Sequence, residues 1–194
     1  MKKHLLVLLL SFLAADCYAQ DSLNFGKVRA DTAFNCKEER PRQPEFGIID
    51  ICDSKNQFEL RLAMMSRPHG SKVVIILTYN DKKWDIKKYR RDSKSLGDML
   101  TVSSFKYEEY MKNYIFGIIF DSLKKNNVFT LPNQHELKLE GHVYDGGAYQ
   151  ITFKVNNYFR SYWFENPETY LEENPGVTEL KQYIAIVRNL ISLF

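Results

Sequence analysis

A two-residue alternation of apolar and polar side chains constrains the fold of this chain more than any other feature. It runs through "QFELRLAM" (57–64) and again through "AYQITFKV" (148–155). Successive side chains of a strand point to opposite faces of a sheet, so this alternation is typical of a strand with one buried face. The segment "KVVIILTY" (72–79) is apolar at almost every position, which predicts a central strand covered on both faces.

The remaining segments complete the order of elements. Apolar residues at helical spacing predict one helix over 105–125 and a second from Pro175 nearly to Phe194. Further strands are expected at 45–52, 84–91, 135–143 and 158–164. The sequence therefore predicts an α+β fold with a mainly antiparallel sheet of about seven strands, in the order ββββ-α-βββ-α, packed against two main helices.

Turn chemistry sets the register of the last hairpin. Asn156 and Asn157 fit a two-residue turn, because asparagine tolerates a positive φ. This turn pairs Ile151 with Tyr162 and brings the aromatic row of the final strand onto the apolar face. Arg160 falls within that row, and its charged head is expected to reach water at the turn end.

Residues 1–19 have the pattern of a cleaved export signal. Lys2 and Lys3 precede the apolar run 5–15, and small residues stand where a signal peptidase recognises its substrate. Cleavage is expected after Ala19, because the run is shorter than the roughly 20 residues that span a bilayer. The chain is then expected to be periplasmic or secreted, with no transmembrane segment once the signal is removed.

The exported chain divides into an irregular segment and a folded part. Residues 20–45 are polar and contain Pro41 and Pro44, so an irregular segment is expected there. Residues 46–194 are expected to form a single α+β domain. Two small lobes, 46–126 and 127–194, are the alternative.

Cys36 and Cys52 are the cysteines that remain after the signal is removed. An even pair in an oxidising compartment favours a disulfide between them over two separate buried thiols. The bridge would tie the irregular segment to the folded domain.

Charge and motifs narrow the function. The chain carries 27 Lys and Arg against 24 Asp and Glu, a net charge of +3, so composition predicts no nucleic-acid partner. The motifs GxSxG, HExxH, GxxxxGK[ST], GxGxxG and CxxC are absent, and no cofactor or metal is expected. A non-enzymatic domain is therefore favoured over an enzyme.

The segment "LEGHVYDGG" holds the best catalytic candidates, Glu140, His142 and Asp145. On a strand, Glu140 and His142 would point to the same side, where a carboxylate and an imidazole serve acid–base chemistry. The loop after this strand is expected to pair Val143 with Tyr149. That register places Glu140 and His142 on the polar face, where charged residues normally meet water. A small secreted hydrolase built on these residues is thus an alternative and not the favoured interpretation.

The densest charge run, "NDKKWDIKKYRRDSK", interleaves lysines and arginines with Trp84 and Tyr89. Cations beside aromatic rings, such as Lys87 between the two, suit phosphate or sugar groups. Lysine-rich edge strands also prevent pairing between molecules, and this solvated edge is the favoured interpretation.

Two aromatic residues, Phe159 and Trp163, fall on the sheet face opposite the apolar row. Either the terminal helix covers them, which is slightly favoured, or they form a binding platform. The favoured function is an exported, non-enzymatic binding or interaction domain of the bacterial cell envelope, contacting an envelope protein or a glycan there. A carrier of an apolar ligand, held between the sheet and the helix at 105–125, is a further alternative.

Overall fold

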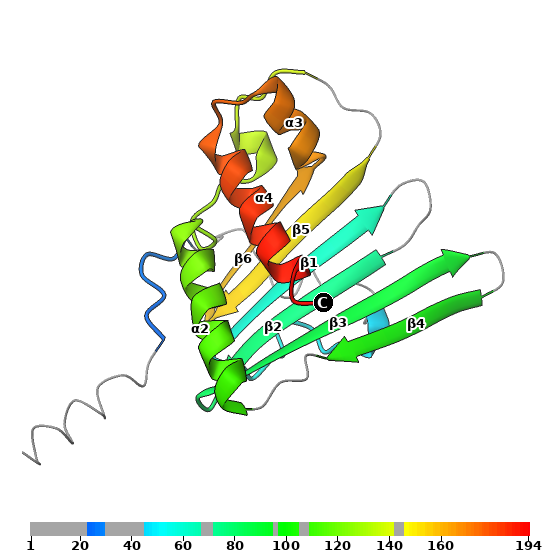
Figure 1. Cartoon of the computed structure of the whole chain (residues 1–194), viewed down its shortest axis with the longest axis vertical. Helices are drawn as coiled ribbons and strands as arrows, with labels where there is room; N and C mark the ends of the chain where they lie inside the picture. Colours follow the sequence, from blue (N-terminus) through cyan, green and yellow to red (C-terminus); the bar gives the residue numbers. More distant parts are fainter. Residues whose placement is uncertain (1–22, 30–44, 67–71, 95–96, 105–108, 142–145) are drawn as a thin grey trace, which may run out of the picture.

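The computed structural model describes residues 23–29, 45–66, 72–94, 97–104, 109–141 and 146–194 (Figure 1). Its centre is one six-stranded sheet with the strand order β4-β3-β2-β1-β5-β6, and every neighbouring pair is antiparallel. The strands are β1 (Phe58–Ser66), β2 (Lys72–Asn80), β3 (Lys83–Lys94), β4 (Gly97–Ser104), β5 (Gly147–Val155) and β6 (Tyr158–Glu165).

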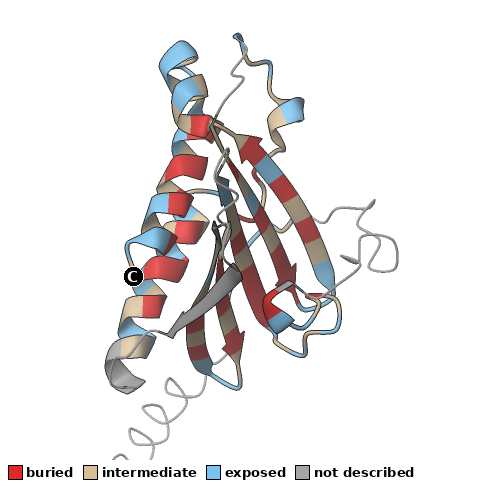
Figure 2. Ribbon diagram, turned by 90° about the vertical axis from the view of Figure 1, so that its right-hand side faces the viewer, coloured by how far each residue is buried: buried red, intermediate tan, exposed pale blue. Residues whose placement is uncertain are grey.

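Helices cover one face of this sheet. They are α2 (Glu109–Lys125), α3 (Pro167–Glu173) and α4 (Thr178–Ile191), with short 3-10 turns η1 (Glu45–Gly47) and η2 (Gln134–Glu136). Figure 1 shows α2 and α4 in front of the sheet, and Figure 2 shows their buried residues turned toward it. The predicted α+β class with an antiparallel sheet is confirmed. Among the described residues, the sheet has six strands where seven were expected, and there are three α-helices where two main ones were expected.

The strand expected at 45–52 does not form. Phe46 and Gly47 have φ values of 62° and 67°, and backbone in this left-handed region cannot continue a strand. The segment instead begins with η1 and continues as turns and irregular backbone to β1. The fourth strand before α2 is β4, which the sequence reading missed.

The strand expected at 135–143 is also absent over its described part, 135–141. Its expected place beside β5 is taken by β1, which pairs Leu62 with Ile151. A side chain replaces a partner strand here: the Asn174 amide accepts from the Glu140 N–H at 2.9 Å and donates to the Glu140 carbonyl at 3.0 Å. Leu137 still packs against the core. The pairing expected for Val143 lies outside the described residues.

The β5–β6 hairpin has the predicted register, with Ile151 opposite Tyr162. Asn156 has a φ of 52°, as the two-residue turn requires. Arg160 corrects the expectation of a solvated head: it is only 2% exposed. Its Nη2 donates to the Leu131 carbonyl at 2.5 Å, because the segment after α2 folds over the end of its strand.

The helix-covered face holds the main core. The Phe58 ring is fully buried, with its centroid 5.7 Å from that of Phe120 on α2 and 5.9 Å from that of Trp84 on β3. At the other end, Phe164 of β6 and Tyr183 of α4 have ring centroids 4.1 Å apart. Because β1 pairs with β5, residues from both predicted lobes build one sheet and share this core.

Two buried tyrosines on this side, Tyr162 and Tyr183, have raised pKa values. Burial raises the pKa of Tyr162 well above its ordinary value of 10, since the ionised form would lose its hydration. Burial likewise raises the pKa of Tyr183. Their hydroxyls donate to the carbonyls of Val128 and Tyr149, at 2.8 and 2.9 Å, so the neutral forms are satisfied within the fold.

Candidate functional site on the outer face

The sheet face opposite the helices, called the outer face below, carries the other half of each alternating strand. One cross-strand row shows its composition: Trp163, Gln150, Ala63, Val74 and Tyr89, from β6 across to β3. The row has an exposed indole and an amide at the β6 and β5 end and small apolar side chains toward β2. The face divides into two halves according to what covers it.

The first half is covered by residues 45–57, called the strap below. Phe46 of the strap is 7% exposed and packs on Val74 and Ile76 of β2. Tyr89 of β3 borders the same small cluster, with its ring centroid 6.2 Å from that of Phe46. β2 is therefore covered on both faces, as its continuous apolar sequence predicts.

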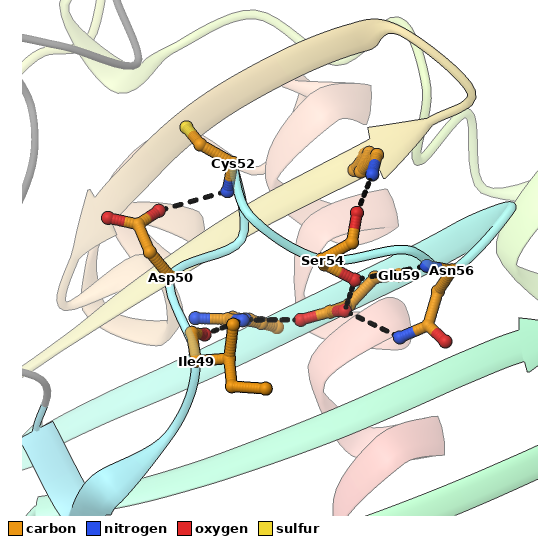
Figure 3. Close-up of polar contacts among 8 residues, drawn as sticks. Ile49, Asp50, Cys52, Ser54, Asn56 and Glu59 are labelled. Carbon is orange, nitrogen blue, oxygen red and sulfur yellow. Dashed lines mark hydrogen bonds and ion pairs between the residues drawn. The ribbon is translucent and has the colours of Figure 1, made fainter.

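A buried carboxylate, Glu59 of β1, ties down the rest of the strap (Figure 3). It is 3% exposed and accepts hydrogen bonds from Ser54 Oγ at 2.5 Å and Asn56 Nδ2 at 2.8 Å. Arg61 Nε donates to its other oxygen at 2.6 Å. A buried charge is tolerated when it is paired and hydrogen-bonded in this way.

The two cations beside Glu59 also bind strap backbone. Arg61 Nη2 donates to the Ile49 carbonyl at 2.5 Å, and the Lys154 ammonium donates to the Ser54 carbonyl. Lys154 is 8% exposed, so strap and sheet bury this group together. The arrangement anchors a segment, because each charged group holds the strap or another member of the network.

The second half of the outer face, called the open half below, consists of Gln150 and Thr152 on β5 and Phe159, Ser161 and Trp163 on β6. Trp163 is 44% exposed. Ser161 Oγ accepts from Gln150 Nε2 at 2.9 Å and lies 3.0 Å from Thr152 Oγ1. The open half thus places an indole beside a connected row of amide and hydroxyl groups.

The free edge of β6 is closed by side chains from the segment before it. Asn133 Oδ1 accepts from the backbone N–H of Trp163 at 3.0 Å, and Gln134 Oε1 accepts from the backbone N–H of Glu165 at 2.6 Å. These amides occupy donors that an added strand would use. A ligand of the open half therefore approaches its face and not this edge.

The structure places Phe159 and Trp163 on the same face of β6, four residues apart, and does not cover them with the terminal helix. α4 packs on the opposite face through its buried residues. Phe159 is half-buried, and the Lys154 ammonium lies 5.8 Å from its ring centroid. The expectation that a helix covers the pair is wrong, and the platform alternative keeps its geometric basis.

The residues expected from the basic run do not join this platform. Trp84 is 7% exposed within the helix-covered core, so it cannot contact a surface ligand. Lys87 lies on the outer face with its ammonium 3.5 Å from an Asp85 carboxylate oxygen. Tyr89 packs beside the strap and stands four strands from Trp163, roughly 19 Å at the usual strand spacing.

The catalytic candidates are not brought together by any described strand. Glu140 is exposed and follows irregular backbone, so the argument that aligned it with His142 loses its basis. His142 and Asp145 lie outside the described residues. Within the described ranges, no three His, Cys, Asp or Glu side chains are grouped as metal ligands would be.

Cys36 lies outside the described residues, so its bridge to Cys52 stays a prediction. The export signal and its cleavage site also lie outside the described residues. In the part of the chain that the structure describes, no helix combines the length and the hydropathy needed to cross a bilayer.

Sequence reasoning missed the strap and the Glu59 network. Glu59 and Arg61 show only as the polar members of an alternating strand. Their partners cannot be found by periodicity, since Lys154 and Ser54 stand 100 positions apart.

No known family model matches the chain, and no curated protein matches it in sequence. A functional conclusion therefore rests on the geometry of the chain itself.

Proposed function

We propose that this chain is an exported, non-enzymatic binding domain of the bacterial cell envelope, and that the open half of the outer face is its ligand surface. The observation that carries the proposal is the 44% exposure of Trp163 on the sheet face away from α2 and α4. Tryptophan is enriched among the residues that dominate binding energy, because it buries a large area and offers an N–H donor.

The surroundings of Trp163 support this assignment. In the neighbouring half, Arg61 pairs with Glu59, and the Lys154 ammonium binds the Ser54 carbonyl of the strap. The Asn133 amide accepts from the backbone N–H of Trp163. Fixing this backbone before a ligand arrives lowers the entropic cost of binding.

A comparative capture experiment tests the proposal. The tagged chain, a Trp163→Ala variant and a Tyr114→Ala variant are incubated with solubilised envelope fraction, and bound proteins and saccharides are identified by mass spectrometry. Tyr114 is a matched control because its 68% exposed ring lies on α2. We expect one component to be captured by the wild type and the control and lost from Trp163→Ala. Equal capture by all three proteins would overturn the proposal.

Export, cleavage after Ala19 and the Cys36–Cys52 disulfide belong to the same proposal. The basic start, the short apolar run and the even cysteine pair support them. Sequencing of the exported protein is expected to begin at Gln20, and thiol titration of the unfolded chain is expected to detect no free thiol before reduction. Retention of the leader would contradict the cleavage.

The two alternatives have less support. For a carrier of an apolar ligand, the space between α2 and the sheet is already filled by packed rings, such as Trp84 and Phe120 with centroids 5.4 Å apart. A hollow of about 310 Å³ near Phe25 and Lys124 lies at the end of α2 and not under it. For a hydrolase, Glu140 stands on irregular backbone, and a His142→Ala variant with unchanged activity in a substrate screen would remove that alternative.

A further inference from the structure

The geometry points to a neutral saccharide as the ligand of the open half. This inference rests on the proposed function and adds the chemical class of the ligand. It is carried by three features of the open half: its lack of an available cation, its row of neutral hydrogen-bonding groups and its small apolar area.

Charge comes first. The five side chains that form the open half are uncharged. The next residue on the same side of β6, Glu165, carries a carboxylate that would repel an anion, and the nearest cations are already engaged. Lys154 is 8% exposed and binds the Ser54 carbonyl, while Arg61 binds Glu59 and the Ile49 carbonyl. An anionic ligand would find no available cation among these groups, so electrostatic complementarity selects a neutral one.

The second feature is the hydrogen-bonding capacity of the polar side chains in the open half. Gln150, Ser161 and Thr152 are linked at 2.9 and 3.0 Å. An amide offers two donors and one acceptor oxygen, and each hydroxyl is both donor and acceptor. The row therefore keeps capacity for groups that both donate and accept, which the hydroxyls of a sugar do.

The third feature is the small apolar area that Trp163 offers. Trp163 supplies a partly exposed indole beside this row, and the face of an indole suits the flat C–H face of a sugar ring. A standard protein interface buries about 800 Å² on each partner around an apolar centre. The open half is only two strands wide, roughly 5 Å between strand axes, and the strap stands on its other side. These dimensions fit a saccharide better than a protein.

The experiment measures binding of the purified chain to immobilised neutral polysaccharides (β-glucan, α-glucan, xylan, mannan and N-acetylglucosamine polymer) and to anionic ones (polygalacturonate and heparin). The variants are Trp163→Ala, Trp163→Phe, Gln150→Ala and the control Tyr114→Ala. We expect binding to at least one neutral class and competition by its free oligosaccharide. Trp163→Ala is expected to weaken binding about tenfold or more, and Gln150→Ala several-fold. Trp163→Phe should retain part of the affinity, and Tyr114→Ala all of it.

Three outcomes would overturn the inference: no binding to any neutral polysaccharide, salt-sensitive binding to the anionic ones alone, or neutral binding that Trp163→Ala leaves unchanged. Capture of an envelope protein that depends on Trp163, without saccharide binding, would overturn the saccharide and leave the proposed binding function standing. Loss of both would overturn both. Circular dichroism of each variant separates lost binding from lost folding.

Discussion

The two faces of the sheet are built from the same strands but are stabilised in different ways. On the helix-covered face, rings such as Phe58, Trp84 and Phe120 form one continuous apolar core. On the outer face, the strap is held by a smaller apolar cluster and by the buried carboxylate of Glu59. The open half beside it leaves Trp163 partly in water. The helix-covered face therefore contributes most of the apolar packing, and the open half contributes little to it.

The largest effect should come from the helix-covered core. Phe58→Ala removes a fully buried ring that contacts aromatic residues from the sheet and from α2. We expect the free energy of unfolding to fall by about 3–5 kcal/mol, measured by urea denaturation. The matched change on the open half, Trp163→Ala, is expected to cost less than about 1 kcal/mol. Similar losses for both would break the distinction between the faces.

The next effect concerns the anchor of the strap. Glu59→Ala leaves Arg61 without its carboxylate and removes the acceptor of the Ser54 hydroxyl and the Asn56 amide. We expect a loss of about 2–3 kcal/mol, because a partly buried charge loses its partner. Hydrogen exchange should rise in 45–57 and stay unchanged in α4. The control Glu140→Ala changes an exposed glutamate, and a strap that exchanges no faster in Glu59→Ala than in this control would show that the network does not hold it.

A smaller effect is expected from the buried tyrosines at high pH. The unfolded chain ionises Tyr162 near pH 10, whereas burial raises the pKa of Tyr162 in the fold. The unfolded state then binds fewer protons, so stability falls as pH rises above about 10. Tyr162→Phe should reduce that fall by about 1.4 kcal/mol per pH unit, in urea titrations between pH 9 and 11. Between pH 7 and 8 both proteins should show the same slope, and identical slopes above pH 10 would refute the buried, neutral tyrosine.

The smallest effect concerns the closed edge of β6. Asn133→Ala removes the acceptor of the Trp163 backbone N–H. We expect a loss of about 1 kcal/mol and a greater tendency to associate, since an exposed strand edge pairs with other chains. Light scattering at increasing concentration measures the association. A variant that stays as monodisperse and stable as the wild type would show that this amide does not protect the edge.

Much of the sheet could be predicted because alternation is a local property. The pairing of Ile151 with Tyr162 followed from strand parity and from the two asparagines of the turn. The segment at 135–141 has the same alternation, yet its backbone is held by the Asn174 side chain. Alternation reports which side chains are buried, and it does not identify the partner of the backbone.

The candidate site was predictable to the same extent. The alternation of side chains along β6 placed Trp163 and Phe159 on the outer face. It did not indicate which segment would cover that face. Coverage by the strap depends on contacts between segments far apart in sequence, such as Lys154 with Ser54. Arg160 shows the same limit, because its partner carbonyl belongs to the segment that follows α2.

The accessibility of Trp163 tests the central claim most directly. Trp84→Phe leaves Trp163 as the single tryptophan, since the sequence contains 2. Acrylamide quenching of its fluorescence is then measured with and without the component identified in the capture experiment. The account predicts efficient quenching in the free protein and protection when the ligand is bound. A tryptophan already shielded in the free protein, or quenched equally at saturating ligand, would contradict it.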